Sequence, residues 1–186
     1  MLDTNFKNWT LLRLKKMERY FEAADLLQWV GENGKRPKRI MFWALPQSLK
    51  DMTFGQRITL MKAYEVGDVF GSTYRQLTKV PTILLPFLPI RLTFPFVAFV
   101  IEDLKQRAKR DESLVIPLTP EQKAAGLDKM NHGWFGVIDS LVKRSNGKYD
   151  HADIERLPDN RIYYMRKIDV DEVMAQRRLI EQTNTK

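Results

Sequence analysis

The 186 residues are enough for one domain with a sizeable core, and a composition of 44% apolar and 29% charged residues is typical of a folded globular protein. The absence of cysteine excludes disulfides, thiolate catalysis and cysteine-based metal sites. The net charge of +8 is concentrated in the front half, since residues 1–40 hold nine Lys/Arg against five Asp/Glu, whereas residues 101–186 hold sixteen against fifteen. This basic excess favours an acidic partner, either nucleic acid or an acidic protein surface.

Residues 1–34 are expected to form an N-terminal helical arm. Apolar and aromatic residues recur at helical spacing between Phe6 and Val30, and glycines follow as stop signals. Trp9 and Trp29 belong to this arm and are candidate interaction residues, because aromatic side chains supply much of the binding energy of protein interfaces. The mixed charges at its start do not match a secretory signal. Since a glycine-containing basic hinge follows, we expect the arm to reach towards a neighbouring molecule.

Residues 35–45 are expected to form a basic linker and a short apolar segment. The linker carries a cluster of four basic residues, Lys35, Arg36, Lys38 and Arg39. With Trp29 and Trp43 nearby, the cluster is a candidate contact for nucleic acid or an acidic partner, because cations neutralise phosphates and an indole can stack on a base. The alternative is a solvated linker beside two core tryptophans. The apolar run Ile40–Leu45 predicts a strand or an extended segment.

The stretch PQSLKDMTFGQ, residues 46–56, predicts the start of a helix in a helical domain over residues 46–186. Thr53 followed by Gln56 forms a capping box, in which the threonine hydroxyl accepts from the Gln56 amide and the glutamine side chain accepts from the Thr53 amide. Helix initiation explains the stretch fully, since nothing in it is reactive. A second short helix is predicted over residues 68–78.

The apolar segment Val80–Ile101 is long enough to cross a bilayer. It contains four prolines, and Arg91 lies near its centre. Each proline removes a backbone donor, and an arginine at mid-bilayer is costly. We therefore assign the segment to the protein core. A helix is predicted to begin after it, at Pro95 or Phe96, because a proline in the first turn loses no hydrogen bond.

The C-terminal part of the chain predicts further helices. Thr119 and Gln122 repeat the capping box, and an apolar stripe continues to about Arg144. The Asn-Gly pair of SNGKYD indicates a turn, a short helical turn follows, and a last helix is predicted from residue 159 or 160 to about 182. The predicted fold class is mainly α: a compact multi-helix domain with an N-terminal helical arm and at most one short β element.

No catalytic, cofactor-binding or metal-binding constellation emerges from the spacing. The two histidines, His132 and His151, are nineteen residues apart, whereas two zinc ligands on one helix need a spacing of three or four. The acidic run Asp169–Glu172 predicts a solvated helix face, because its two aspartates point in nearly opposite directions on a helix. The glycines at 31 and 34 are too close for a phosphate loop. We therefore expect a protein that is not an enzyme and holds no cofactor or metal.

Three segments together resemble a known class of protein. LPQSLKDMTFGQRITLMKA resembles the opening P-x-x-l-x-D-x-T-x-G-Q of small tail-assembly-chaperone-like and related virion structural proteins of tailed bacteriophages. HGWFGVIDSLVKRSNGKYDHADIERLPDNRIYYMRKIDVDE is similar to their later helix–turn–helix segment, with the apolar FPFVAFVIEDL between the two. The resemblance covers about residues 45–182. It implies small helical proteins that act without catalysis and bind other virion components, often as rings or multimers.

These observations predict a non-enzymatic structural or assembly protein of a tailed bacteriophage, acting by protein–protein contacts in the tail or the head–tail connector. The expected partners are other virion or phage assembly proteins and further copies of the same chain, with the virion or the host cytoplasm as the location. The alternative is a basic nucleic-acid-binding regulatory protein. A peripheral membrane protein that uses Val80–Ile101 is a minor third reading.

Overall fold

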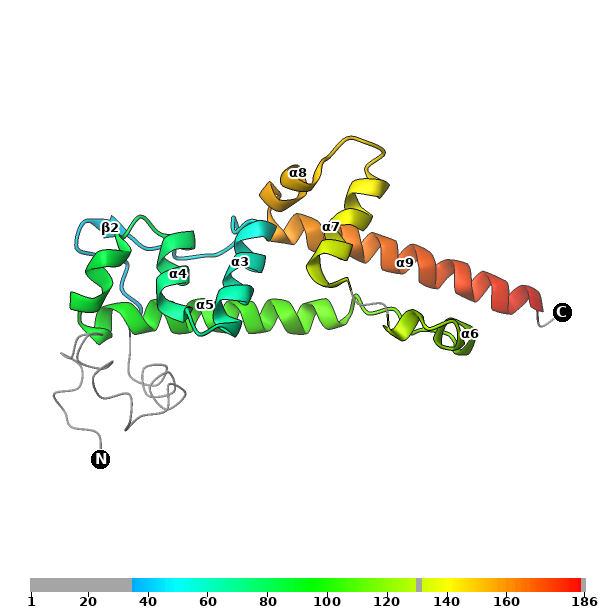
Figure 1. Cartoon of the computed structure of the whole chain (residues 1–186), viewed down its shortest axis with the longest axis horizontal. Helices are drawn as coiled ribbons and strands as arrows, with labels where there is room; N and C mark the ends of the chain where they lie inside the picture. Colours follow the sequence, from blue (N-terminus) through cyan, green and yellow to red (C-terminus); the bar gives the residue numbers. More distant parts are fainter. Residues whose placement is uncertain (1–34, 130–131, 185–186) are drawn as a thin grey trace, which may run out of the picture. The chain divides into compact units, whose positions relative to one another are not determined.

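The computed structural model describes residues 35–129 and 132–184, and this part of the chain is mainly helical with one two-stranded antiparallel sheet, as predicted (Figure 1). The predicted N-terminal arm, with Trp9 and Trp29, lies outside the described residues. In chain order the elements are β1 (Arg39–Ile40), β2 (Trp43–Ala44), α3 (Phe54–Glu65), α4 (Val69–Leu77), the 3-10 helix η2 (Thr82–Phe87), α5 (Ile90–Glu112), α6 (Pro120–Ala124), the 3-10 helix η3 (Leu127–Lys129), α7 (Gly133–Arg144), α8 (His151–Arg156) and α9 (Asp159–Asn184).

The described chain divides into two units, and each is built from two separate stretches of sequence. Unit 1 contains the residues up to Leu49 together with Thr59–Lys105, and unit 2 contains Lys50–Ile58 together with the residues from Gln106 onwards. The division falls inside α3 and again inside α5, so both helices contribute residues to both units. The predicted boundaries at residues 34 and 45 stay a prediction.

In unit 1, α4 packs against the N-terminal part of α5 through aromatic side chains. The ring centroids of Phe70 and Phe94 lie 4.5 Å apart, and those of Tyr74 and Phe96 lie 5.5 Å apart. The fully buried Tyr74 also donates its hydroxyl to the backbone carbonyl of Thr93 at 2.9 Å. Burial raises the pKa of the Tyr74 phenol, so this hydroxyl stays a donor. The Tyr74 ring thus packs α4 against α5, and its hydroxyl has a hydrogen-bond acceptor on α5.

The predicted start of α5 at Pro95 or Phe96 was wrong, because the helix begins at Ile90 and contains Pro95 in its interior. A proline there lacks the N–H that would bond the carbonyl four residues earlier and disturbs the helix by about 3 kcal/mol. Burial offsets this cost, since the apolar face of the helix runs straight across the proline. Its members are all buried: Ile90, Phe94, Val97, Val100 and Leu104. The proline-rich segment thus contributes Val80, Leu85 and Leu88 to the core, as the sequence indicated, but Ile83 and Phe87 in the same segment are exposed, so the assignment holds only in part.

The core of unit 2 joins four helices that are distant in sequence. Figure 1 shows α7 and α8 on one side of the N-terminal half of α9, while the C-terminal half of α9 runs on beyond them. Their apolar faces meet the first turns of α3 in a buried cluster of Phe54, Ile58, Ile138, Leu141, Ile154 and Ile162. Trp134 packs against the edge of this cluster, with its ring 5.6 Å from that of Phe54.

The predicted capping box at the start of α3 is confirmed. The Thr53 amide donates to the Gln56 side chain at 2.9 Å, and the Gln56 amide donates to the Thr53 hydroxyl at 3.2 Å. Gly55 lies where α3 approaches α8, and a Cβ at that position would come within 3.1 Å of the Glu155 carbonyl oxygen. The Thr-Phe-Gly-Gln stretch therefore starts a helix and allows a second helix to pack closely on it.

The helix predicted to run from Thr119 to Arg144 is broken into α6, η3 and α7. Its capping box forms as predicted, with the Gln122 amide on the Thr119 hydroxyl at 3.3 Å. The helix nevertheless stops before Gly126, whose φ of 78° places it in the left-handed region. A glycine adopts this conformation without steric cost, so the helix ends where the apolar spacing alone predicted continuity.

Within the described residues, the remaining predictions for helices and turns are confirmed. The Asn-Gly turn places Asn146 at a φ of 51°, and α8 and α9 follow it within one or two residues of the predicted ends. Asp150 caps α8 by accepting from the Asp153 amide at 2.7 Å. Within residues 35–129 and 132–184, no helix is both long enough and apolar enough to cross a bilayer.

Candidate binding surface

A β-hairpin in unit 1 presents two apolar side chains to solvent. Its strands pair Arg39 with Ala44 and Ile40 with Trp43, and the turn between them consists of Met41 and Phe42. The Phe42 side chain is 88% exposed and that of Met41 is 59% exposed. Met41 also has a φ of 51°, a left-handed conformation that costs a residue with a side chain about 1–2 kcal/mol. An exposed apolar turn held in an unfavourable backbone conformation is the kind of feature that binding surfaces use.

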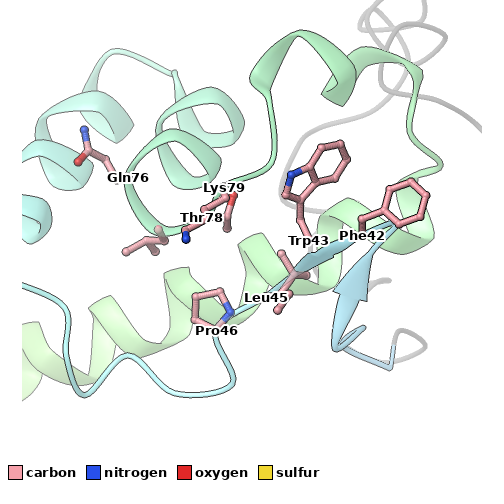
Figure 2. A pocket seen from close by; sticks show the side chains of 9 residues that line it. Phe42, Trp43, Leu45, Pro46, Gln76, Thr78 and Lys79 are labelled. Atoms are coloured by element: carbon pink, nitrogen blue, oxygen red, sulfur yellow. The ribbon is translucent and has the colours of Figure 1, made fainter.

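A groove of about 560 Å³ lies beside the hairpin. One wall comes from the hairpin and the segment after it, and the other from the last turn of α4 and the residues that follow. The lining residues are Phe42, Trp43, Ala44, Leu45, Pro46, Gln76, Leu77, Thr78 and Lys79. Figure 2 shows the rings of Phe42 and Trp43 on the hairpin side and Thr78 and Lys79 on the opposite side. The groove is therefore mostly apolar, with a cation at one edge.

The four basic residues of the linker have two different roles. Lys35, Lys38 and Arg39 have exposed side chains. Arg36 is half-buried instead: its guanidinium lies 3.8 Å from the centroid of the Phe99 ring and donates to the Gln47 carbonyl at 2.8 Å. Arg36 thus attaches the linker to α5, which leaves three exposed cations of the predicted cluster near the hairpin.

The hairpin itself was not recognised from the sequence. The run Ile40–Leu45 was predicted to be one strand or an extended segment, but it contains the turn and the second strand of a hairpin. Tight hairpin turns usually carry glycine, asparagine or aspartate, and Met41-Phe42 contains none of them. Trp43, predicted as an interaction residue, is half-buried and lines the groove. No residue in this run marks a turn, so local sequence offered no signal that could have identified the hairpin.

A second concentration of polar groups lies in unit 2, where four arginines surround two aspartates. The Asp159 carboxylate accepts from Arg57 at 3.0 Å on Oδ1, and from Arg107 at 2.7 Å and Arg110 at 3.1 Å on Oδ2. Asp111 accepts from Arg57 at 2.7 Å, and Nη1 of Arg166 lies 3.8 Å from the same oxygen. Three separate segments of the chain meet in this arginine–aspartate cluster: the start of α3, the end of α5 and the start of α9.

Asp159 is almost completely buried, with 1% of its side chain exposed. Burial alone raises the pKa of its carboxyl, but the charges of Arg57 and Arg107 and their hydrogen bonds outweigh this effect, so that the pKa lies below its ordinary value. Asp159 is therefore ionised at neutral pH. No local pattern indicates this cluster, because its members lie on three segments that are distant in sequence.

The structure gives ordinary roles to the polar residues that the sequence raised as metal ligands or acid–base groups. The ring of His151 stacks on that of Phe135 at 5.4 Å, and Asp169 and Glu172 both form ion pairs with Arg144. Across residues 35–129 and 132–184, no three His, Asp or Glu side chains gather closely enough to hold a metal ion.

No protein-family model matches the chain, and neither does any curated protein or solved structure with which it was compared.

Proposed function

We propose that this chain is a non-enzymatic structural or assembly protein that acts by protein–protein contacts, of the kind found in the tail or head–tail connector of tailed bacteriophages. The observation that carries the proposal is the exposed Met41–Phe42 turn beside an apolar groove. A large aromatic side chain that is almost fully exposed gains most when a partner removes it from water. The resemblance over about residues 45–182 supplies the phage context.

The partner surface that suits this site is apolar with acidic residues around it. Phe42 and the groove offer the apolar contact, while Lys38, Arg39 and Lys79 are exposed close to the turn in sequence or on the groove wall. Cations of this kind guide an acidic partner and fix its orientation more than they add affinity. Other virion or assembly proteins, and further copies of this chain, are the partners that we propose, in the virion or the host cytoplasm.

The second candidate function is a basic nucleic-acid-binding regulator. What favours it is the exposure of Lys35, Lys38 and Arg39 beside the half-buried Trp43. Against it, the Arg36 guanidinium contacts the Phe99 ring and the Gln47 carbonyl. Three of the four basic residues of the predicted cluster are therefore exposed for contact with phosphates. Few phosphates can be neutralised by so small a set, and both affinity and its salt dependence scale with that number.

The test is the mass of the purified protein in solution, measured by light scattering after size exclusion for the wild type and two variants. We expect a multimer for the wild type and a smaller species for Phe42→Ser. Val66→Ser is the matched control, because Val66 is also an exposed apolar residue of unit 1 but does not line the groove, and it should leave the mass unchanged.

DNA binding separates the two candidate functions. An assembly protein should bind duplex DNA weakly while it self-associates. A monomer that binds DNA tightly, with affinity falling steeply as salt rises, would overturn the assembly proposal and support the regulator. A multimer whose mass is the same in the Phe42→Ser variant would remove the hairpin from the proposal.

A further inference from the structure

The groove beside the hairpin is an apolar site that suits an aromatic side chain. The rings of Phe42 and Trp43 line it and stand edge to face, with their centroids 6.4 Å apart. A third ring stabilises such a pair because aromatic rings favour edge-to-face and offset contacts, and because it removes the exposed Phe42 from water. The Leu45 amide donates to the Lys38 carbonyl at 2.9 Å, so backbone hydrogen bonding fixes the hairpin wall of the groove.

Exposed positive charge accompanies this apolar site on both walls. On the hairpin wall, Arg39 is exposed and pairs across the ladder with Ala44, which lines the groove. On the opposite wall, Lys79 is exposed (Figure 2). Residues 35–50 contain five Lys/Arg and no Asp/Glu, and none of the described residues that line the groove is acidic. The matching occupant is therefore an aromatic side chain accompanied by carboxylates.

The chain itself contains such a segment just before the basic linker. Residues 20–32, YFEAADLLQWVGE, hold three acidic residues and no Lys or Arg, in a chain whose net charge is +8. Within this segment, Glu22, Asp25 and Trp29 follow one another at intervals of three and four residues. On the helix that the sequence predicts here, this spacing places them on one face. The segment thus combines an aromatic anchor with carboxylates, which complements the groove in both polarity and charge.

The length of the linker favours a segment that comes from a second copy of the chain. Only residues 33–35 separate Glu32 from Arg36, whose guanidinium contacts the Phe99 ring and the Gln47 carbonyl. Three residues extend to at most about 11 Å, so a chain's own segment stays close to this anchor and has few orientations in which to enter its groove. A segment from another copy has no such restriction.

We propose that residues 20–32 of one copy occupy the groove of a neighbouring copy, with Trp29 against Phe42 and with Glu22 and Asp25 at the cationic edge. The inference rests on the proposed function, because it names the segment through which further copies of this chain bind. The segment and the groove are different surfaces of the chain, so each copy gives one segment and receives another. Such head-to-tail contacts build a closed ring or an open filament.

Carbodiimide cross-linking of the full-length protein tests this pairing without any substitution. The reagent joins a carboxylate to a lysine amine in contact with it, with loss of water and formation of an amide bond. Unlabelled and isotope-labelled chains are combined in urea, refolded together, cross-linked and digested for mass spectrometry. We expect Lys79 or Lys38 to be joined to an acidic residue of segment 20–32, in pairs of peptides of which only one is labelled. The proposal is overturned if such links occur only between peptides with the same label, or if both lysines are joined only to other segments.

Substitution of the anchor separates this inference from the proposed function. Trp29→Ser should raise the Kd between copies about tenfold or more, as expected for the loss of an aromatic side chain at the centre of an interface. Trp9→Ser is the matched control, because it removes the same side chain from residues 1–34 outside the segment, and it should leave the mass unchanged.

The variants also distinguish which of the two proposals fails. If Phe42→Ser dissociates the multimer but Trp29→Ser, folded by circular dichroism, does not, the groove has a different occupant; the inference is then overturned while the proposed function stands. If the wild type is a monomer at every concentration, self-association fails in both.

Discussion

The guanidinium of Arg57 lies 3.0 Å from the carboxylate of Asp159, although 102 residues separate the two along the chain. Asp159 also donates its backbone N–H to the Met52 carbonyl at 2.9 Å. The same residue thus binds the start of α3 through its side chain and through its main chain. Within unit 2, this relationship fixes the first turn of α9 against the segment that begins α3.

We expect Asp159→Asn to destabilise the protein by about 3–5 kcal/mol, because the change removes the negative charge that compensates buried arginines. The free energy of unfolding is measured by urea titration. Asp171→Asn is the matched control, since Asp171 pairs with Lys167 on the exposed face of α9 and its loss should leave stability almost unchanged. Equal effects of the two substitutions would show that the buried cluster contributes no more than a surface pair.

The stability of the fold should decrease in acid because of the same residue. The pKa of Asp159 is lowered below its ordinary 3.8 in the folded state, so folding favours the ionised form. The resulting stabilisation is fully present above about pH 5 and is lost as the pH falls through the folded-state pKa. Urea titrations between neutral and acidic pH should show a shallower decline for Asp159→Asn than for the wild type. Parallel curves would contradict this assignment.

Loss of the α3 capping box should have a larger effect than loss of the α6 capping box. Thr53→Ala leaves the Gln56 amide without its acceptor, at the helix start that carries buried Phe54 and Arg57, and should cost about 1 kcal/mol. Thr119→Ala removes the same type of cap from α6, which has no buried residue, and should change the free energy of unfolding less. The comparison fails if both substitutions lower stability equally.

The core of unit 2 predicts a contrast between two leucines. Leu141 is buried in the cluster that joins α3, α7, α8 and α9, so Leu141→Ala should destabilise by about 2–5 kcal/mol through lost burial and the cavity left behind. Leu179 is exposed on the C-terminal half of α9, so Leu179→Ala should change stability by less than about 0.5 kcal/mol. Chemical denaturation of both variants checks the contrast. A large loss for Leu179→Ala would indicate that this face is covered in solution.

The left-handed conformation of Met41 predicts that glycine is tolerated at the hairpin turn. Met41→Gly removes a backbone cost of about 1–2 kcal/mol and adds a smaller entropic cost in the unfolded chain, so Tm should stay the same or rise. Phe42→Gly is the control, because Phe42 does not have a positive φ and gains nothing from glycine. A drop in Tm for Met41→Gly that matches that of Phe42→Gly would contradict the assigned turn conformation.

Local patterns predicted most of the helical architecture, because capping and apolar spacing act within a few residues. The boxes at Thr53 and Thr119 and the short helix before α9 follow from such patterns. Pro95 was misjudged because the burial of a long apolar face exceeds the local cost of one proline. The apolar spacing predicted that one helix continues past Gly126. The helix ends before this residue because Gly126 adopts a left-handed backbone conformation.

The candidate sites were harder to predict for a different physical reason. The arginine–aspartate cluster pairs residues from three segments, and no spacing rule links Arg57 with a carboxylate 102 residues away. The groove forms between Phe42 on the hairpin and Lys79 after α4, so it exists only once these segments pack. The basic linker was recognised, but the commitment of Arg36 to Phe99 depends on tertiary contact.

The construction of unit 2 from two stretches of sequence determines when it can be completed during synthesis. Translation delivers Lys50–Ile58 early and α9 last, so nascent Phe54 and Arg57 leave the ribosome long before Ile162 and Asp159 do. Meanwhile all the residues of unit 1 have already emerged, which allows it to fold first, as N-terminal units generally do. The emergence of α9 is therefore the step that covers the waiting apolar and cationic side chains, and a ribosome stalled before Asp159 would leave them unpaired.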